Sequence, residues 1–314
     1  MLVHLVRTVV IGAVNWDTNL FIKRFPNSGQ EAVIKRITRV PGGKAGNTAV
    51  AAARLLGPKQ AAILGGLGKD SIGAEQVKIF ESEGVVTSGL KFCDDAASGQ
   101  AYIAIDDEGA NIIYKYSGAN AMIKPSDLDD PVRRAMISES AAIAIMDPPF
   151  ETAVRMAKTA KEFDKVVAWD PGVNSELGLA KVRTLLKYVD YLIANEHEVA
   201  NLTGVRSSVA AAKRLAASVK EMKVVVKLGG KGCILYDGGK KEVLRNIDLS
   251  AVGLKAVNTV GCGDAFLGAF VAALSEGLTS VDALRWGNCA GGLKATRFET
   301  RGSPDRETLL KHLS

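Results

Sequence analysis

Short runs of apolar, largely β-branched residues alternate along the chain with longer segments that carry apolar residues at helical spacing. The runs predicted to be strands are Arg7–Ala13, Ala61–Gly65, Ala141–Met146, Val166–Trp169, Tyr191–Ala194 and Val224–Leu228. Helical spacing is clearest at Ala45–Leu56, Glu151–Phe163 and Ser207–Val219. Continuously apolar strands separated by helices are typical of a mostly parallel sheet with helices on both faces. The pattern therefore predicts an α/β fold.

Two stretches, residues 17–40 and 98–117, break this alternation. The first contains EAVIKRITRV, which partly alternates between apolar and polar residues as a half-exposed strand does. The second has turn residues at Asp106–Gly109 between two apolar runs, which is typical of a hairpin. We expect both stretches to form a small antiparallel sheet that acts as a lid; ordinary peripheral strands are the alternative. No linker or repeat divides the chain, so residues 1–314 are expected to form one domain.

The composition narrows the class of protein. Apolar residues make up 47% and charged residues 24% of the 314 residues, as in a soluble globular chain. No apolar run approaches the roughly 18 residues of a membrane helix, so no membrane protein is expected. The net charge of +6 is dispersed and aromatic residues are only 6%, which argues against a nucleic-acid partner. An anionic small substrate or a nucleotide fits the excess positive charge better.

The cysteines and histidines exclude several kinds of site. The four cysteines lie far apart, with no CxxC pair, at Cys93, Cys233, Cys262 and Cys289. This spacing indicates a reducing compartment, and hence the cytoplasm, rather than disulfides or a structural zinc site. Three histidines leave little material for a metal cluster or a histidine-based triad.

The glycine motifs lack the two commonest nucleotide-binding patterns, since neither GxxxxGK[ST] nor GxGxxG occurs. The segment NTVGCGDAFLGAF, residues 258–270, remains, in which Gly261 and Gly263 flank a turn before an apolar helix. Backbone N–H groups at a helix start attract anions, and glycines let an anion approach closely. Asp264 in the first turn is either a helix-terminal acid or a base that accepts a proton from an attacking hydroxyl.

A second motif is PGGKAGNTAVAAARLLG, residues 41–57, in which two glycines precede an alanine-rich helix. Lys44 and Asn47 are polar residues at the entrance of this helix. Lys44 is either a solvated charge or a ligand contact, and Asn47 is either a helix cap or a ligand contact.

Polar residues also follow several predicted strands. Asn15 and Asp17 follow the first strand and share one face if that segment is extended, although both residue types also favour turns. Asn195 and Glu198 have the spacing of a capping box. The glycine-rich LGGKGC, residues 228–233, is most simply a connection after a strand.

The order of these motifs resembles the ribokinase-like (PfkB-type) family of carbohydrate and nucleoside kinases. PGGKAGNTAVAAARLLG and NTVGCGDAFLGAF are similar to the two signature regions of that family, and the resemblance covers essentially the whole chain. It implies an enzyme with a central, mostly parallel sheet flanked by helices and a small β-sheet lid. The implied reaction transfers the γ-phosphoryl group of ATP to a primary hydroxyl of a ribose-type furanose, either a free sugar or a nucleoside.

The resemblance also implies roles for single residues. Asp264 would be the general base, and the N–H groups of Gly261, Cys262 and Gly263 would form the anion hole. Asn195 and Glu198 would organise hydrated Mg²⁺, with Glu198 acting through water. The residues expected at the sugar are Asn15, Asp17, Gly43, Lys44, Asn47 and Asp147. Those expected at the nucleotide are Lys227, Gly229, Gly230, Gly232 and, beside adenine, Asn288.

The sequence departs from the family pattern at three positions. Asn258 stands where an acid is usual, so the monovalent-cation site of many members is doubtful here. Cys262 stands where alanine is more usual. A thiol at a helix start tends to have a lowered pKa and would then be sensitive to oxidation, but a buried, inert packing role is favoured. Lys227 stands where threonine is frequent.

Several questions stay open on the sequence alone. PGGKAGN and NWD resemble ribokinase, whereas DPPF, WDPG and NEHE resemble broad-specificity nucleoside kinases; fructose, another hexose or a keto-deoxy sugar acid are further acceptors to consider. A non-catalytic regulator with a kinase fold is the alternative from another class, and the retention of Asp264 and both glycines argues against it. Exposed strands in the two inserts also leave open a homodimer through the lid.

Overall fold

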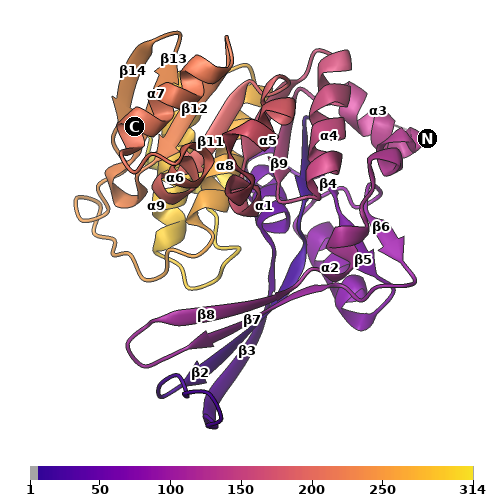
Figure 1. The fold of residues 1–314 in the computed structure, drawn as a ribbon, viewed down its shortest axis with the longest axis vertical. Coiled ribbons are helices and arrows are strands. Elements are labelled where there is room, and N and C mark those ends of the chain that lie inside the picture. The colour runs from indigo at the N-terminus through magenta and orange to yellow at the C-terminus, as the bar shows by residue number, and fades with distance from the viewer. Residues whose placement is uncertain (1–5, 314) are drawn as a thin grey trace.

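The computed structural model describes residues 6–313 and is built around an eight-stranded sheet (Figure 1). Its strands in chain order are β1 (Thr8–Gly12), β4 (Ala61–Leu64), β9 (Ala142–Met146), β10 (Val166–Asp170), β11 (Tyr191–Asn195), β12 (Lys223–Lys227), β13 (Cys233–Asp237) and β14 (Lys240–Leu244). Their spatial order is β14-β13-β12-β11-β10-β9-β1-β4, with parallel pairing from β12 to β4. The predicted α/β class and its mostly parallel sheet are confirmed.

β13 and β14 form an antiparallel edge that the sequence pattern did not predict. β14 has the sequence KKEVL and exposes four of its five residues, as its burial pattern shows. A strand at the edge of a sheet buries little, so it carries no apolar run.

Helices cover both faces of the large sheet (Figure 1). They are α1 (Lys44–Leu56), α2 (Ser71–Ser82), α3 (Pro131–Glu139), α4 (Phe150–Glu162), α5 (Gly178–Leu186), α6 (Glu196–Thr203), α7 (Ser208–Ser218), α8 (Cys262–Ser275), α9 (Ser280–Ala295) and α10 (Arg306–Lys311). Short 3-10 turns occur at η1 (Gly118–Met122), η2 (Pro125–Asp129), η3 (Gly172–Leu177) and η4 (Gly229–Lys231). α1, α8 and α9 contribute to one hydrophobic core, and α3 to α7 contribute to the other.

Small residues bring α1 and α8 into close contact. A Cβ at Gly268 would lie 2.6 Å from the Cβ of Ala51 and 2.7 Å from the Thr48 carbonyl oxygen. Because no side chain separates the helices there, their first turns lie next to each other. The same packing therefore places Asp264 near Asn47.

A second, four-stranded sheet projects from the main body (Figure 1). Its order is β3 (Ile34–Gly42), β2 (Asn15–Ile22), β7 (Gly99–Ile105) and β8 (Asn111–Tyr116). The expectation of a wholly antiparallel sheet is wrong, since β2 and β7 pair in parallel from Asn15 opposite Gly99. Both strands leave the core at the same place and run outward together, and each then returns by its own hairpin.

A short parallel pair, β5 (Gly66–Gly68) and β6 (Lys91–Cys93), completes the strands within residues 6–313. None of the helices in that part of the chain combines the length and the hydropathy needed to span a bilayer.

Candidate active site

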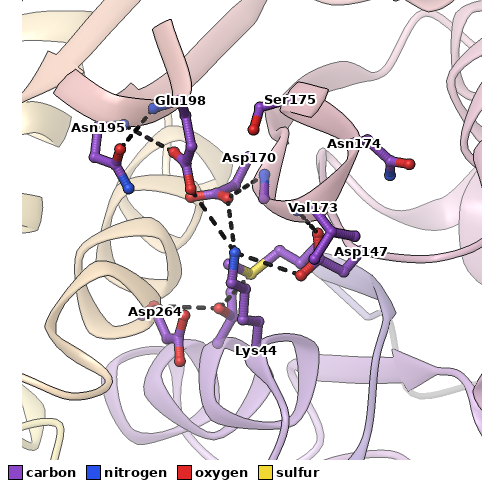
Figure 2. A network of polar contacts seen from close by, with 12 residues as sticks. Lys44, Asp147, Asp170, Val173, Asn174, Ser175, Asn195, Glu198 and Asp264 are labelled. Carbon is purple, nitrogen blue, oxygen red and sulfur yellow. Dashed lines mark hydrogen bonds and ion pairs between the residues drawn. The ribbon is translucent and has the colours of Figure 1, made fainter. Parts of the chain in front are cut away.

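Polar side chains gather at the carboxyl ends of the parallel strands, beside the first turns of α1 and α8 (Figure 2). Asp170, Asn195 and Lys227 are the last residues of β10, β11 and β12. Asp147 directly follows β9. In an open parallel sheet this edge is the usual place of a ligand site, because every strand delivers its next residue there. The parallel sheet therefore brings residues that are far apart in the chain into one cluster.

Lys44 is at the centre of that cluster (Figure 2). Its Nζ lies 3.4 Å from Asp147 Oδ2, 3.5 Å from Asp170 Oδ1 and 3.9 Å from Glu198 Oε1. Burial would lower the pKa of Lys44, but the carboxylates of Asp170, Asp147 and Glu198 outweigh it and raise the pKa. Lys44 is thus an ion-paired group rather than a freely solvated charge.

Asp147 is held in an uncommon backbone conformation. Its φ is 56°, a left-handed value that few residues other than glycine adopt. Its Oδ1 accepts a hydrogen bond from the Val173 N–H at 3.0 Å, so the carboxylate bridges Lys44 and η3.

Asp170 and Lys227 form a buried ion pair at 2.6 Å. Only 3% of the Asp170 side chain and 14% of the Lys227 side chain are exposed. Burial would raise the pKa of Asp170, but Lys227 and Lys44 lower it overall. Asp170 is a site residue that was not predicted, although an acid at the end of an apolar strand, in WDPG, is a usable signal.

Asp264 is buried and does not cap its own helix. The N-cap residue of α8 is Gly261, and no side chain caps that end. Asp264 Oδ2 instead accepts a hydrogen bond from Asn47 Nδ2 at 2.8 Å. Burial raises the pKa of Asp264 to about 6, against the lowering effects of the Asn47 hydrogen bond and of Lys44. Asn47 likewise does not cap α1, whose N-cap residue is Gly43.

The turn before α8 depends on Gly261, which has a φ of 86°. A Cβ there would lie 2.3 Å from the Thr300 carbonyl oxygen. The Cys262 N–H donates to the Thr259 carbonyl at 3.2 Å and so belongs to the turn itself. Burial raises the pKa of the Cys262 thiol, which supports the inert packing role rather than sensitivity to oxidation.

Asp17 and Asn15 lie at the base of the small sheet and are both buried. Burial raises the pKa of Asp17 to about 6, while Arg301 acts to lower it. Asn15 Oδ1 accepts a hydrogen bond from Asn120 Nδ2 at 2.8 Å. A Cβ at Gly42 would lie 2.1 Å from Asp17 Oδ2, so glycine is required beside this carboxylate.

Arg301 is a site residue that the sequence did not reveal. Its Nε donates to Asn47 Oδ1 at 3.1 Å, and its Nη2 donates to the Gly42 carbonyl and to Gln76 Oε1 at 3.0 Å. Arg301 therefore holds both the glycine turn and the amide that contacts Asp264. No local pattern marks it, since it lies in a loop beyond the second signature region.

Asn195 and Glu198 form the capping box that their spacing predicts. Asn195 Oδ1 accepts from the Glu198 N–H, and Glu198 Oε2 accepts from the Asn195 N–H, both at 2.8 Å. Burial and Asp170 raise the pKa of Glu198. The other carboxylate oxygen, Oε1, faces Lys44, so capping and a second role are compatible.

The expected nucleotide residues lie apart from the Lys44 cluster, with the exception of Lys227. Gly229 and Gly230 belong to η4, and added Cβ atoms would meet open space there. Gly232 is needed for the fold, since its φ is 97° and a Cβ would lie 2.0 Å from the Leu244 carbonyl oxygen. Asn288 Nδ2 donates to the carbonyls of Leu244 and Arg245 and ties α9 to the end of β14.

The chain is similar over nearly its whole length to known carbohydrate kinases. The family model described as pfkB family carbohydrate kinase matches residues 7–307. A ribokinase of Lactococcus lactis is 32% identical over 294 residues, covering 93% of this chain and 92% of the relative. An ATP-dependent ribose-1-phosphate kinase of Halopiger xanaduensis is 30% identical, covering 99% of both chains. The structure of Arabidopsis thaliana ribokinase complexed with ribose and ATP has a TM-score of 0.85 at 27% identity, covering 99% of each chain. This chain therefore belongs to the pfkB family of carbohydrate kinases, as a phosphotransferase that acts on a sugar hydroxyl.

Proposed function

We propose that the protein transfers the γ-phosphoryl group of ATP to the primary hydroxyl of a ribose-type furanose, with Asp264 as the general base. The observation that carries the proposal is the state of Asp264. It is buried, has a pKa of about 6, and lies in the first turn of a helix that follows Gly261. A carboxylate with a pKa close to neutrality is ionised at pH 7 and still basic enough to accept a proton.

The chemistry follows from the contacts of that carboxylate. Asn47 holds Oδ2, which leaves Oδ1 to accept the proton of the acceptor hydroxyl. The hydroxyl oxygen then forms the new bond to the γ-phosphorus while the bond to the β-phosphate oxygen breaks and ADP leaves. The N–H groups of Gly261 and Gly263 and the N-terminal end of α8 stabilise the charge of the transferring group.

The remaining polar groups of the site would bind the sugar and the nucleotide. Asn15, Asp17 and Lys44 would contact the sugar hydroxyls, with Gly43, Asn47 and Asp147 beside them. Lys227, Gly229, Gly230, Gly232 and Asn288 would lie along the nucleotide. The supporting observation is that Asp17 and Lys44 both interact electrostatically with Asp264.

Mg²⁺ would bind at this site together with the phosphates of the nucleotide. Within residues 6–313 no group of three or more acidic, histidine or cysteine side chains could hold a metal by itself. Mg²⁺ keeps most of its water and is commonly bound by one or two carboxylates together with substrate phosphates. Glu198, through water, and Asn195 would hold it, and the ion would neutralise charge on the phosphates.

Glu198→Gln is expected to raise the Mg²⁺ concentration that gives half-maximal rate several-fold, because the neutral amide attracts metal-bound water less than a carboxylate does. Glutamine keeps the oxygen that caps the helix, so the unfolding midpoint changes little. Glu196→Gln, on the same helix and exposed, is the matched control. An unchanged Mg²⁺ titration would restrict Glu198 to its capping role.

A screen of ADP release tests the proposed function directly. Ribose, ribose 1-phosphate, nucleosides, fructose and a keto-deoxy sugar acid are supplied as acceptors with ATP and Mg²⁺. We expect the largest kcat/KM with ribose, the acceptor named in the ribokinase relatives. If no acceptor raises ADP release although ribose and ATP bind by calorimetry, a non-catalytic sugar-binding regulator replaces the proposal.

The pH profile separates two carboxylates that both have a pKa of about 6, Asp17 and Asp264. Burial raises both values, so protonation removes the reactive form as the pH falls through 6. If both groups must be ionised, log kcat/KM falls with a limiting slope of about 2 below that pH. Asp17→Asn should lower that slope to about 1. A single-proton slope in the native protein would remove Asp17 from the ionised site.

We further propose that the four-stranded sheet closes over the bound sugar. Asp17 lies in β2 and Gly42 ends β3, so both strands of the first hairpin have an end at the site. Closing a site excludes water, which would otherwise compete with the sugar for the phosphoryl group. Lys35 and Asp107 form an ion pair at 2.6 Å that links the two hairpins, so the sheet can move as one body.

Replacing Asp106–Gly109 by a shorter turn is expected to raise the KM for the acceptor and to increase ATP hydrolysis relative to transfer. Hydrogen exchange measures closure: protection within 17–40 and 98–117 should rise when the acceptor is added. Unchanged protection would contradict closure, and a dimer in light scattering that dissociates on this replacement would make the sheet a homodimer interface instead.

A further inference from the structure

Lys294, in the last turn of α9, is a buried cation that the proposed reaction does not use. Its exposed fraction is 0%. Its Nζ donates to the Asn258 carbonyl at 3.0 Å and to the Arg297 carbonyl at 3.4 Å. No ion pair joins it to an acidic side chain within residues 6–313. Burying an ammonium without a carboxylate partner is costly, and burial lowers the pKa of Lys294, while Cys262, Glu299 and Asp264 act to raise it.

The two carbonyls belong to two loops: Asn258 lies in the loop that leads into α8, and Arg297 lies in the loop that follows α9. The N–H groups of Val257 and Asn258 both donate to the Ala295 carbonyl, at 2.8 and 3.0 Å. Asn258 Nδ2 donates to the Phe298 carbonyl at 2.7 Å. The segments 257–261 and 295–300 are therefore tied together, and they present backbone oxygens toward the position of the Lys294 ammonium.

Backbone carbonyls that converge on one point are the ligands that proteins use for a dehydrated monovalent cation such as K⁺. An ammonium group carries the same charge and can donate to the same oxygens. The side chain of Asn258 is neutral. Its Nδ2 donates to the Phe298 carbonyl, and its Oδ1 accepts from the Val260 N–H. The positive charge beside the Asn258 and Arg297 carbonyls is thus supplied by the Lys294 side chain.

We propose that Lys294 is a built-in cation, a positioning residue that fixes the loop of residues 258–261 and makes phosphoryl transfer independent of an added monovalent cation. The inference rests on the proposed role of Gly261 and Gly263 at the transferring phosphoryl group. The close approach of Gly261 to the Thr300 carbonyl shows why position matters here. A Cβ at Gly261 would lie 2.3 Å from the Thr300 carbonyl oxygen, so the 295–300 loop packs directly against the turn that begins α8.

The first test is the response of the rate to cations. The native protein should have the same kcat, within about twofold, in potassium chloride and in tetramethylammonium chloride of equal ionic strength. Lys294→Ala removes the ammonium and leaves space, and should lower kcat by about 100-fold with a smaller change in KM, as expected for a misplaced catalytic loop. Potassium or ammonium ions are small enough to occupy the vacated carbonyl site, so they should raise the kcat of Lys294→Ala at least about tenfold. Tetramethylammonium is too large and should leave that kcat unchanged.

Two variants control for simple loss of structure. Lys294→Met fills the space without a charge, so its kcat should stay low in every salt. Lys223→Ala removes a half-buried lysine whose Nζ lies 2.9 Å from Ser280 Oγ, at the opposite end of α9. It should lose some stability and gain no response to potassium.

Thermal unfolding provides a readout that needs no activity. Potassium should raise the Tm of Lys294→Ala above its value in tetramethylammonium, whereas the native Tm should be equal in both salts. A native protein that requires potassium, or a folded Lys294→Ala that responds to potassium in neither Tm nor rate, would overturn the inference. A potassium-specific rise in Tm together with no transfer to any acceptor in the native protein would uphold the cation site and contradict the proposed function.

Discussion

Asp264→Asn is expected to lower kcat by about 10²–10⁴ while acceptor and ATP binding stay nearly unchanged. Asparagine has the same shape but cannot accept a proton from the sugar hydroxyl. The hydrogen bond at Asn47 can be kept by rotating one amide, so the site should stay assembled. The measurement is steady-state turnover of the best acceptor together with its Kd from calorimetry.

Asp282→Asn is the matched control, because Asp282 lies in the first turn of the neighbouring helix α9 and caps it with Thr279. Its loss should reduce stability slightly and leave kcat at the native value. An Asp264→Asn protein with native turnover would show that the proton goes elsewhere, and the proposed base would be wrong.

Lys227→Met is expected to lower the free energy of unfolding by about 3–5 kcal/mol, the usual effect of removing one partner of a buried ion pair. Asp170 is 3% exposed, and of its two ion-pair partners within residues 6–313 it would keep Lys44, at 3.5 Å. A buried carboxylate with too little compensation is destabilising, because water can no longer solvate it. Urea unfolding of the native protein and the variant measures the difference.

A double-mutant cycle isolates the pair itself. Asp170→Asn in the Lys227→Met background should cost much less than Asp170→Asn alone, because no charge is then left unpaired. Lys35→Met is the surface control: its partner Asp107 is also 2.6 Å away, but the two side chains are 48% and 55% exposed. That change should cost less than about 1 kcal/mol. Equal costs for Lys35→Met and Lys227→Met would contradict the role given to burial.

The local pattern of the sequence identified the elements that make the core. Each run predicted as a strand is present, because a strand buried on both faces must be continuously apolar wherever it is placed in the sheet. The entrances of α1 and α8 could be predicted for a similar reason, since a glycine turn followed by small apolar residues constrains the backbone locally. The order of these motifs along the chain was enough to indicate the family.

Local sequence patterns could not predict which side chains from distant segments contact each other. Asn47 has the sequence signature of a helix cap as well as of a ligand contact, and only the packing of α1 on α8 turned its amide to Asp264. A helix start by itself favours a lowered thiol pKa at Cys262, whereas burial in the folded protein raises that pKa. The contact between Asn47 and Asp264 joins residues 217 positions apart in the chain, beyond the reach of any local pattern.

The sequence by itself thus determined the α/β fold, the kinase family and most of the residues at the strand ends. The tertiary structure alone decided the parallel pairing of β2 with β7, the pairing of Asp170 with Lys44 and Lys227, and the burial of Arg301 and Lys294. The physical reason is the distance along the chain over which each effect acts. Periodicity and turn chemistry act within a few residues, whereas burial, ion pairing and pKa depend on which distant segments fold against one another.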